Sequence, residues 1–504
     1  MVRLYECSPE VLHVAFPGKL GQEAWRQIHV NGCYAADAAT RGHFGTSAAF
    51  VGKPTAINET TCAVRAVRSA VGILLSQAIG QLNVLRLRKD FAMKLHHIGR
   101  RSLVWTLTLA IVLLNWTTVL PARSLQQKPR AELSRFVVVG DSLSAGFQNG
   151  SLIETAQVNG YAALIASQAG VDLALPLIAS PGIPNVLTLV SPGPPPVIAP
   201  APGVSTGRVN PSLQPSNLAV PGARVQDALT TRPNLPVNSL TDFVLGFPSV
   251  FILGQPPRSQ VEQAELLAPT TVIIWLGNND ALGAALAGNP ALLTPVASFE
   301  ASYAEVMNRL GQTGATLVIA NIPDVTVVPA LITAEEVAAQ VGQPLSAIGP
   351  ILGIAAGDFV TQAGLGLIPG ILANPATGPL PGGAVLTATE TALVRERVQD
   401  FNEIIAEQAA LHGAVLVDIN SVTARLDEQG YVVGGQRLTT DFLGGLFSLD
   451  GVHPTNTAYA IIANEFIKSL NKRAAAGIAP VNVRNIQRND PLVLVGSGHP
   501  AASF

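Results

Sequence analysis

Three residues from two distant parts of this chain have side chains that together could perform nucleophilic catalysis. Ser142 follows an apolar, β-branched run, Phe136 to Val139, and so stands at the carboxyl end of an expected strand. His453 lies three residues after Asp450. A serine hydroxyl becomes an effective nucleophile when a histidine takes its proton, and a carboxylate can hold the imidazole tautomer. These residue types predict attack of Ser142 on a carbonyl, with His453 as the base and Asp450 as its partner.

Two further positions carry groups suited to an active site. Gly222 follows a short apolar run, and a glycine allows close approach of the backbone. Asn279 follows the expected strand Thr271 to Leu276, which puts a carboxamide at a strand end. When each residue is considered alone, a role in a turn explains the presence of Gly222 or Asn279 equally well, and a role as a helix cap explains the presence of Ser142. The assignment therefore depends on whether the fold brings these residues together.

An open parallel α/β sheet would position such residues, because these sheets carry their chemistry at the carboxyl ends of the strands. From Arg135 the chain alternates short β-branched runs with longer helical or loop segments, as a parallel sheet with crossover connections requires. The near-continuous apolar runs indicate strands that are buried on both faces. The expected strands are 136–139, 271–276, 316–320 and 414–419, and the expected helices are 160–167, 299–310, 387–411 and 456–470.

Four blocks of this sequence together resemble one known family. In chain order they are Gly140-Asp-Ser-Leu143, Asn217 to Gly222, Leu276 to Asp280, and Leu449 to Pro454. Their order and strand contexts are similar to those of the SGNH hydrolases, the GDSL esterase and lipase superfamily, over about Arg135 to Lys472. The resemblance implies a hydrolase domain over residues 135–474. Its implied fold is a three-layer α/β/α sandwich with a flavodoxin-like, mainly parallel sheet of about five strands.

The resemblance also implies a reaction and a role for each site residue. The reaction is hydrolysis of a carboxylic ester through an acyl-enzyme, with no cofactor and no metal. Each hydrogen-bond donor to the oxyanion contributes about 3 to 4 kcal/mol in comparable sites. The implied roles are a catalytic triad of Ser142, Asp450 and His453, an oxyanion hole formed by Ser142, Gly222 and Asn279, and supporting carboxylates at Asp141 and Asp280.

Two long inserts interrupt the expected domain. Residues 176–215 contain 11 of the 37 prolines and Arg208 as their only charge, so the segment cannot be regular helix. Residues 329–383 are rich in Ala, Leu, Ile, Gly and Pro, and carry only three charges. Apolar loops of this length commonly form lids or walls of binding sites, although they can equally enlarge a core. Their composition favours a substrate with an apolar acyl chain.

The first 124 residues have the organisation of an export signal preceded by an extension. Residues 1–92 lack sustained periodicity, whereas Met93 begins a basic segment that leads into the uncharged run Leu103 to Leu120. This order predicts a signal peptide at 93–124, followed by a linker at 125–134. Initiation at Met93 would make residues 1–92 an over-extended reading frame, the alternative being a disordered extension. The apolar run is also long enough for a signal anchor that attaches the protein to a membrane. Both interpretations predict export to the periplasm, the cell surface or the medium.

Composition argues against several other functions. The net charge of −2 divides into +8 over residues 1–124 and −10 over the rest, and an acidic main body does not favour nucleic acid as a partner. The cysteines Cys7, Cys33 and Cys62 all precede the main body, which therefore contains neither a disulfide framework nor a thiolate metal site. The sequence has no dinucleotide or phosphate-binding glycine motif, and the tail 475–504 has no pattern that indicates a role.

The resemblance leaves the substrate open. The apolar inserts favour a lipase, a lysophospholipase or a long-chain esterase acting on a small-molecule or lipid ester. The family also includes sugar deacetylases, thioesterases and acyltransferases, and a fold cannot choose among them. A different hypothesis is a non-catalytic binding protein on a hydrolase scaffold. The presence of all the Ser, Gly, Asn, Asp and His residues favours the enzyme.

Overall fold

The computed structural model describes residues 3–8, 11–16, 24–29, 131–191, 193 and 196–496. The chain divides into two units, residues 1–123 and 124–504. In the first unit, three strands that the sequence pattern does not predict form an antiparallel sheet: β1 (Arg3–Ser8), β2 (Val11–Phe16) and β3 (Ala24–His29). The expected signal segment 93–124, with its apolar run, lies outside the described residues. Among the residues that are described, no helix is both long and apolar enough to cross a membrane.

A parallel sheet of four strands forms the centre of the second unit. Its two middle strands are buried almost throughout, because their β-branched runs face helices on both sides. The parallel register pairs Gly140 with Trp275, so the first and second strands in chain order end side by side. The spatial order is β12-β8-β7-β4, where β4 is Phe136–Gly140, β7 is Thr271–Trp275, β8 is Thr316–Ala320 and β12 is Val415–Val417.

An extended segment occupies a fifth position in this sheet. Residues 216–220 run along the other edge of β4, where Val138 forms a parallel bridge with Asn217. The N–H of Leu218 donates to the carbonyl of Val138 at 2.9 Å. With this segment included, the strand order is flavodoxin-like, and the α/β fold expected from the sequence is confirmed. The sheet therefore has four regular strands and, beside β4, one segment that forms a single bridge.

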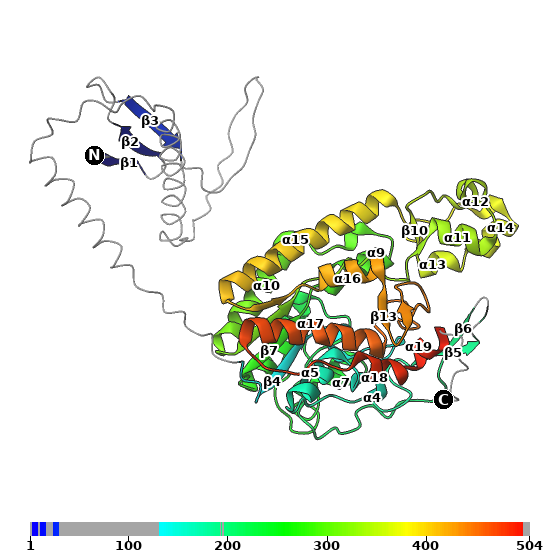
Figure 1. Ribbon diagram of the computed structural model, residues 1–504, viewed down its shortest axis with the longest axis horizontal. Coiled ribbons are helices and arrows are strands. Elements are labelled where there is room, and N and C mark those ends of the chain that lie inside the picture. The colour runs from blue at the N-terminus through cyan, green and yellow to red at the C-terminus, as the bar shows by residue number, and fades with distance from the viewer. Residues whose placement is uncertain are drawn as a thin grey trace, which may run out of the picture. The chain divides into compact units, whose positions relative to one another are not determined.

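Helices cover both faces of this sheet (Figure 1). Two long helices, α10 (Val296–Gln312) and α15 (Ala388–His412), pack against each other on one face. On the opposite face α5 (Tyr161–Ala169) packs against α17 (Asn456–Ala474). All four helices are among those expected from the sequence, and their observed ends lie within four residues of the predicted ones.

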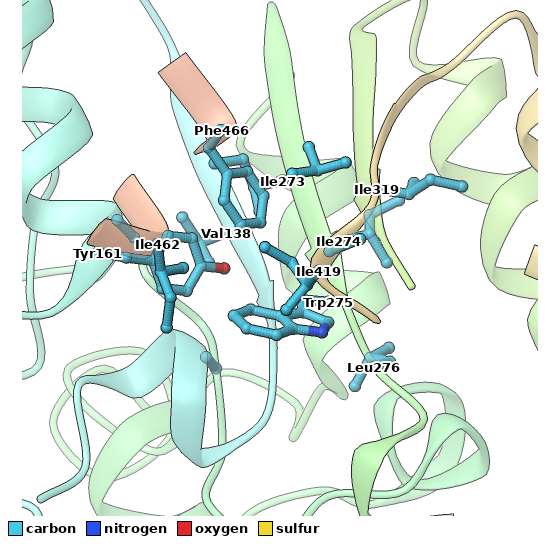
Figure 2. Packing of buried hydrophobic residues seen from close by; sticks show 14 of the residues in the cluster. Val138, Tyr161, Ile273, Ile274, Trp275, Leu276, Ile319, Ile419, Ile462 and Phe466 are labelled. Carbon is cyan, nitrogen blue, oxygen red and sulfur yellow. The ribbon is translucent and has the colours of Figure 1, made fainter. Parts of the chain in front are cut away.

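An aromatic cluster joins β7 to the helices α5 and α17 (Figure 2). Tyr161 stacks on Phe466 with ring centroids 4.7 Å apart, and Trp275 lies edge-on to Tyr161 at 5.4 Å. All three rings are buried. Burial of a large apolar side chain contributes about 1.5 to 3 kcal/mol to stability. Because Trp275 is the last residue of β7, this cluster fixes the strand end at which the candidate site begins.

The one charged residue of the proline-rich insert 176–215 bonds both to the insert itself and to the domain at Phe243. Arg208 is buried, and its guanidinium donates to three backbone carbonyls at 2.9 to 3.3 Å. Burial lowers the pKa of Arg208 to about 10. The insert is not a loop throughout, because β5 (Leu187–Ser191) and β6 (Val197–Pro200) form an antiparallel hairpin within it.

The insert 329–383 folds as a small helical lobe, and the expectation of a long apolar loop is wrong for this segment. Its short helices bury their apolar residues against one another in a hydrophobic core separate from the main one. An antiparallel sheet of two-residue strands lies where the lobe begins and ends. The elements of the lobe are β9 (Ile332–Thr333), α11 (Ala334–Val341), α12 (Leu345–Leu352), β10 (Phe359–Val360), α13 (Gln362–Leu365), α14 (Ile368–Ala373), η3 (Pro375–Thr377) and β11 (Val385–Leu386).

The carboxyl-terminal tail packs against the start of α17. The buried carboxylate of Asp490 accepts hydrogen bonds from the N–H and the hydroxyl of Thr457, both at 2.7 Å. The remaining elements are α3 (Ser142–Ala145), α4 (Glu154–Gln157), α6 (Val225–Thr230), α7 (Leu240–Leu245), α8 (Gln260–Leu266), α9 (Asn278–Leu286), η2 (Pro290–Leu292), α16 (Ile419–Gln429), β13 (Tyr431–Val433), β14 (Gln436–Leu438), α18 (Val483–Arg488) and α19 (Pro491–Gly496).

Candidate active site

The ends of β4 and β7 position two of the predicted site residues. Ser142 is the first residue of α3, two residues after β4 ends, and it is 8% exposed. Asn279 lies in the first turn of α9, which follows β7 directly. Gly277 makes the turn between β7 and α9 at a φ of 109°, a left-handed conformation that favours glycine. A Cβ atom there would also lie 2.7 Å from the side chain of Ile322, so the turn requires glycine.

Asp141 fixes the turn that carries Ser142. Its side chain caps α3, because Oδ1 accepts the N–H of Leu143 at 3.0 Å. Its other oxygen, Oδ2, accepts from Nδ2 of Asn278 at 2.8 Å. Burial raises the pKa of Asp141 to about 6, although the bonds from Asn278 and Leu143 and the nearby His453 act in the opposite direction.

The pair of Asp450 and His453 lies in the loop that precedes α17. Nδ1 of His453 faces Oδ2 of Asp450 at 2.9 Å. The other carboxylate oxygen, Oδ1, accepts the backbone N–H groups of Val452 and His453, both at 2.8 Å. The carboxylate thus holds both its own loop and the imidazole. Nε2 is the ring nitrogen left to exchange a proton with another group.

A fourth donor reaches Asp450 from a distant part of the chain. The N–H of Gly150 donates to Oδ2 of Asp450 at 2.6 Å. Burial alone would raise the pKa of Asp450, but the charge of His453 and the hydrogen bonds to the carboxylate hold this pKa well below its ordinary value. Asp450 is therefore ionised at any pH at which the protein is expected to work, as a partner of an imidazolium must be.

The segment 147–150, just after α3, docks on the loop of Asp450 and His453. The amide of Gln148 donates to the carbonyl of Pro454 at 3.0 Å, and the hydroxyl of Tyr459 donates to the carbonyl of Phe147 at 2.8 Å. The ring of Phe147 also contacts the imidazole of His453, with centroids 4.7 Å apart. These contacts set the distance between the turn of Ser142 and the loop of His453.

Gly222 and Asn279 are linked through the residue after Gly222. Nδ2 of Asn279 donates one hydrogen to the carbonyl of Ala223 at 3.0 Å, which leaves its second hydrogen available. Gly222 has a φ of 82°. Among the described residues, no protein group accepts a hydrogen bond from the backbone N–H of Ser142 or Gly222. These N–H groups and the amide of Asn279 are therefore donors that a ligand could use.

Asp280 supports the same region from the opposite side of the turn. Its buried carboxylate accepts the N–H of Val225 at 3.0 Å, at the start of α6. Burial raises the pKa of Asp280, and this hydrogen bond lowers it. Because Gly222 lies just before α6, the bond ties the Gly222 segment to the first turn of α9. Asp280 thus orients backbone, as does Asp141.

An apolar cavity of about 100 Å³ brings several of the site residues together. Ser142, Asn279 and His453 all line it. One face of α16 supplies a wall, because Ile419, Val422, Thr423 and Leu426 recur at helical spacing. Among the described residues, none from either insert lines the cavity, so the expectation that the inserts form a wall of the substrate site is not met here.

Gly222 lines a second cavity of about 210 Å³ rather than the first. The walls of this cavity include Ala223, Asp227 and Gln260, and so it is more polar. Asn279 lines the first cavity and bonds to Ala223 of the second, so the walls of the two cavities are in contact at the candidate oxyanion donors. In the part of the chain that is described, no cluster of His, Cys, Asp and Glu side chains is arranged to hold a metal ion.

Sequence reasoning missed two contributors to this site. Asn278 bonds to Asp141, and its only signal was its place beside Asn279. Gly150 donates to Asp450 across 300 residues of sequence. The Asn149-Gly150 dipeptide does predict a turn, but no local pattern indicates which carboxylate that turn will contact.

Comparison with known proteins identifies similar chains. A family model described as GDSL-like Lipase/Acylhydrolase matches residues 136–466. No curated protein sequence gives a significant match. Among solved structures, the chain is similar to LAE5, an alpha/beta hydrolase enzyme from the metagenome of Lake Arreo, at 13% identity and a TM-score of 0.31, covering 68% of this chain and 98% of that one. It is also similar to a lipase/acylhydrolase from Enterococcus faecalis, at 12% identity and a TM-score of 0.29, covering 69% of this chain and 99% of that one. A third similar structure is an extracellular lipase from Streptomyces rimosus, at 15% identity and a TM-score of 0.30, covering 67% of this chain and 98% of that one.

Proposed function

This chain belongs to the GDSL-like lipase/acylhydrolase family, and from that premise we propose that it hydrolyses carboxylic esters through an acyl-enzyme on Ser142. One observation carries the proposal. His453, held by Asp450 at 2.9 Å, lines the same cavity as Ser142 and Asn279. A nucleophile, a base with a fixed tautomer and an amide donor are the groups that acyl transfer requires.

The first half of the reaction forms the acyl-enzyme. The hydroxyl oxygen of Ser142 attacks the ester carbonyl while Nε2 of His453 takes the hydroxyl proton. The N–H groups of Ser142 and Gly222 and the amide of Asn279 stabilise the oxyanion of the tetrahedral intermediate. This intermediate collapses, the bond to the alcohol oxygen breaks, and the imidazolium of His453 gives its proton to the departing alcohol. The negative charge of Asp450 stabilises the imidazolium between these steps.

The second half releases the acid. A water molecule gives a proton to Nε2 of His453 and attacks the carbonyl of the acyl-enzyme. The same donors stabilise the second oxyanion. The bond between the acyl carbon and the oxygen of Ser142 then breaks, and the serine oxygen takes back the proton from His453. The carboxylic acid leaves, Ser142 and His453 return to their starting state, and the reaction consumes only the ester and water.

The shape and lining of the cavity favour an apolar acyl chain. Its walls beside Ser142 include Leu143, Val325, Val422 and Leu426, which would exclude water from a hydrocarbon chain. Each methylene group transferred from water into such a site contributes about 0.8 kcal/mol to binding. The more polar cavity at Gly222 is suited to the alcohol part of the ester. The proposed substrate is therefore an ester that joins an aliphatic acyl chain to a polar alcohol.

Export of the protein is part of the proposal. The basic segment from Met93, the uncharged run 103–120 and the polar exit that follows have the order of a signal peptide or a signal anchor. Sequencing of the amino terminus of the secreted or membrane-bound protein distinguishes them. A terminus after residue 120 indicates a cleaved signal, retention of the run indicates an anchor, and protein found only inside the cell would contradict export.

The test of the reaction is hydrolysis of p-nitrophenyl esters from acetate to palmitate by the full chain, beside its Ser142→Ala variant. We expect wild-type activity to rise with acyl length up to a limit set by the cavity, and Ser142→Ala to lose at least a thousandfold in kcat/KM. Activity that survives in Ser142→Ala would contradict the assignment of the nucleophile. A preference for acetate alone would contradict the acyl-chain site, and binding of long-chain esters without turnover would indicate a binding protein.

A further inference from the structure

The buried hydrogen bond between Asp141 and Asn278 joins the two strand ends that carry the reacting groups. Asp141 precedes the proposed nucleophile, and Asn278 precedes the proposed oxyanion amide. The two side chains are 0% and 5% exposed, and their oxygen and nitrogen atoms lie 2.8 Å apart. Neither residue contacts the reacting atoms in the mechanism above. Resting on the proposed ester hydrolysis, we propose that Asp141 and Asn278 form a positioning pair that holds Ser142 and Asn279 in the geometry required for attack.

The helix that begins at Ser142 needs such support. Helix α3 has only four residues, and a single helical turn is unstable alone because nucleation costs more than one hydrogen bond returns. Oδ1 of Asp141 supplies the capping bond to Leu143. The cap itself joins α3 only to its own strand, while Ser144 of α3 also bonds to Tyr161 and Asn217. The bond from Oδ2 to Asn278 attaches it to the neighbouring strand end as well.

The orientation of the Asn278 amide is set by the charge of Asp141. Nδ2 of Asn278 faces the carboxylate, and Oδ1 is buried without a hydrogen-bond partner among the described residues. An unpartnered buried carbonyl is costly, so another orientation of this amide would be preferred if the carboxylate did not demand a donor. A protonated Asp141 could instead donate to Oδ1 after the amide rotates. The arrangement observed therefore depends on an ionised Asp141.

The surroundings of Asp141 make its ionisation sensitive to the hydrogen bond from Asn278. Burial raises the pKa of Asp141 to about 6, and the hydrogen bond from Asn278 is the largest of the influences that lower it. The other titratable groups that interact with Asp141 are His453, which lowers this pKa, Asp280, which raises it, and the buried hydroxyls of Tyr161 and Tyr459. Loss of the Asn278 amide would thus raise the pKa of Asp141 further, because the largest of the influences that lower it would be removed.

The first variants are Asn278→Ala and Asp141→Asn, measured in the full chain with p-nitrophenyl butyrate from pH 5 to pH 8. We expect kcat to fall about tenfold to a hundredfold in each, with KM within about threefold, because misplacement of reacting groups reduces turnover more than binding. In Asn278→Ala the loss should be larger at pH 6 than at pH 8. The two proteins share the same catalytic histidine, so the difference between their pH profiles reports Asp141.

The exchange variant Asp141→Asn with Asn278→Asp is the decisive measurement. An asparagine at 141 can still cap α3 through its oxygen and can donate to a carboxylate at 278, so all the bonds of the pair are restored with the charge on the other strand end. We expect kcat of this double variant to exceed that of either single variant by at least fivefold. Asn289→Ala serves as a matched control, since Asn289 is an exposed asparagine that caps η2, and its kcat should match the wild type.

The outcomes separate this inference from the proposed function. If wild type shows no hydrolysis that depends on Ser142, the proposed function fails. If wild type is active but Asn278→Ala keeps kcat within twofold at every pH, only the positioning pair is overturned. If the single variants unfold, as followed by circular dichroism, the exchange variant decides: recovery of activity supports the pair, and a folded but inactive exchange variant overturns it.

Discussion

Two buried carboxylates lie at the candidate site and come from different regions of the chain. Their environments shift their pKa values in opposite directions. Asp141, at the end of β4, receives one backbone N–H and one amide, and its pKa is raised to about 6. Asp450, in the loop before α17, receives three backbone N–H groups and faces an imidazole, and its pKa is lowered. Burial raises the pKa in both places, so the number and charge of the donors decide the direction.

This difference separates the proposed tasks of the two residues. A carboxylate that stabilises an imidazolium must remain charged throughout the reaction, and the donors to Asp450 ensure this. A carboxylate that positions its neighbours must be ionised only at the working pH to accept its hydrogen bonds, so a pKa near 6 is sufficient for Asp141. Aspartate therefore serves two different purposes in this site. The backbone around each aspartate determines which purpose it serves.

The largest effect that would test this comparison is on catalysis. Replacing Asp450 by Asn should lower kcat about a thousandfold to ten-thousandfold, because the amide cannot stabilise the imidazolium and favours the wrong tautomer of His453. Steady-state kinetics at pH 8 measure this loss of kcat. The loss in Asp141→Asn should be at least tenfold smaller than this. Equal losses in the two variants would mean that the carboxylates do not divide the work as described.

The next effect is on stability, and its sign differs between the two carboxylates. The raised pKa of Asp141 gives a contribution that is complete below about pH 3.8 and lost as pH rises through about 6. Asp141→Asn should therefore gain about 3 kcal/mol of unfolding free energy relative to wild type between pH 4 and pH 7. The lowered pKa of Asp450 gives a contribution that is present above about pH 3.8 and lost only as pH falls further.

Urea unfolding of wild type, Asp141→Asn and Asp450→Asn at several pH values from 3 to 7 measures these contributions. The difference in unfolding free energy between Asp450→Asn and wild type should change as pH falls below about 4. A difference between Asp141→Asn and wild type that does not vary from pH 4 to pH 7 would contradict the raised pKa of Asp141.

A smaller effect should follow from loosening the segment that donates to Asp450. Oδ1 of Asn149 accepts the N–H of Leu449 at 2.9 Å and so holds Gly150 against the carboxylate. Asn149 has a φ of 51°, and Asn149→Gly keeps that conformation while removing the acceptor. We expect a loss of about 0.5 to 1.5 kcal/mol in stability and less than tenfold in kcat. Unchanged stability in chemical denaturation would show that the neighbouring contacts alone hold this segment.

The smallest effect concerns a carboxylate that has a charged partner but is more exposed. Glu262 pairs with Arg232 at 2.5 Å, and the side chain of Arg232 is 43% exposed. The hydrogen bond from Arg232 lowers the pKa of Glu262. Solvent screens such pairs, so Arg232→Ala should change stability by less than about 1 kcal/mol and leave kcat unchanged. A larger change, seen in the same unfolding and kinetic assays, would show that charge pairing matters more than burial in this protein.

Much of the fold could be predicted from local sequence. The β-branched runs at 136–139, 271–276 and 316–320 are strands, and the four expected helices lie close to their predicted positions. The fate of the inserts could not be predicted in this way. Residues 329–383 have the composition of a loop or a lid, and only their packing against one another produces a separate lobe. Composition gives the number of apolar residues but does not predict which of them will pack together.

For the site, the sequence by itself determined the residue types and the strand ends that present them, because strand propensity and turn chemistry act over a few neighbouring residues. It indicated Ser142 and Asn279 on that basis, and Asp450 and His453 by their spacing and by the resemblance of four sequence blocks to a known family. Only the tertiary structure decided the partners: Asn278 with Asp141, and Gly150 with Asp450. Hydrogen bonds between residues over a hundred positions apart depend on sheet register and loop docking. No local pattern carries that information.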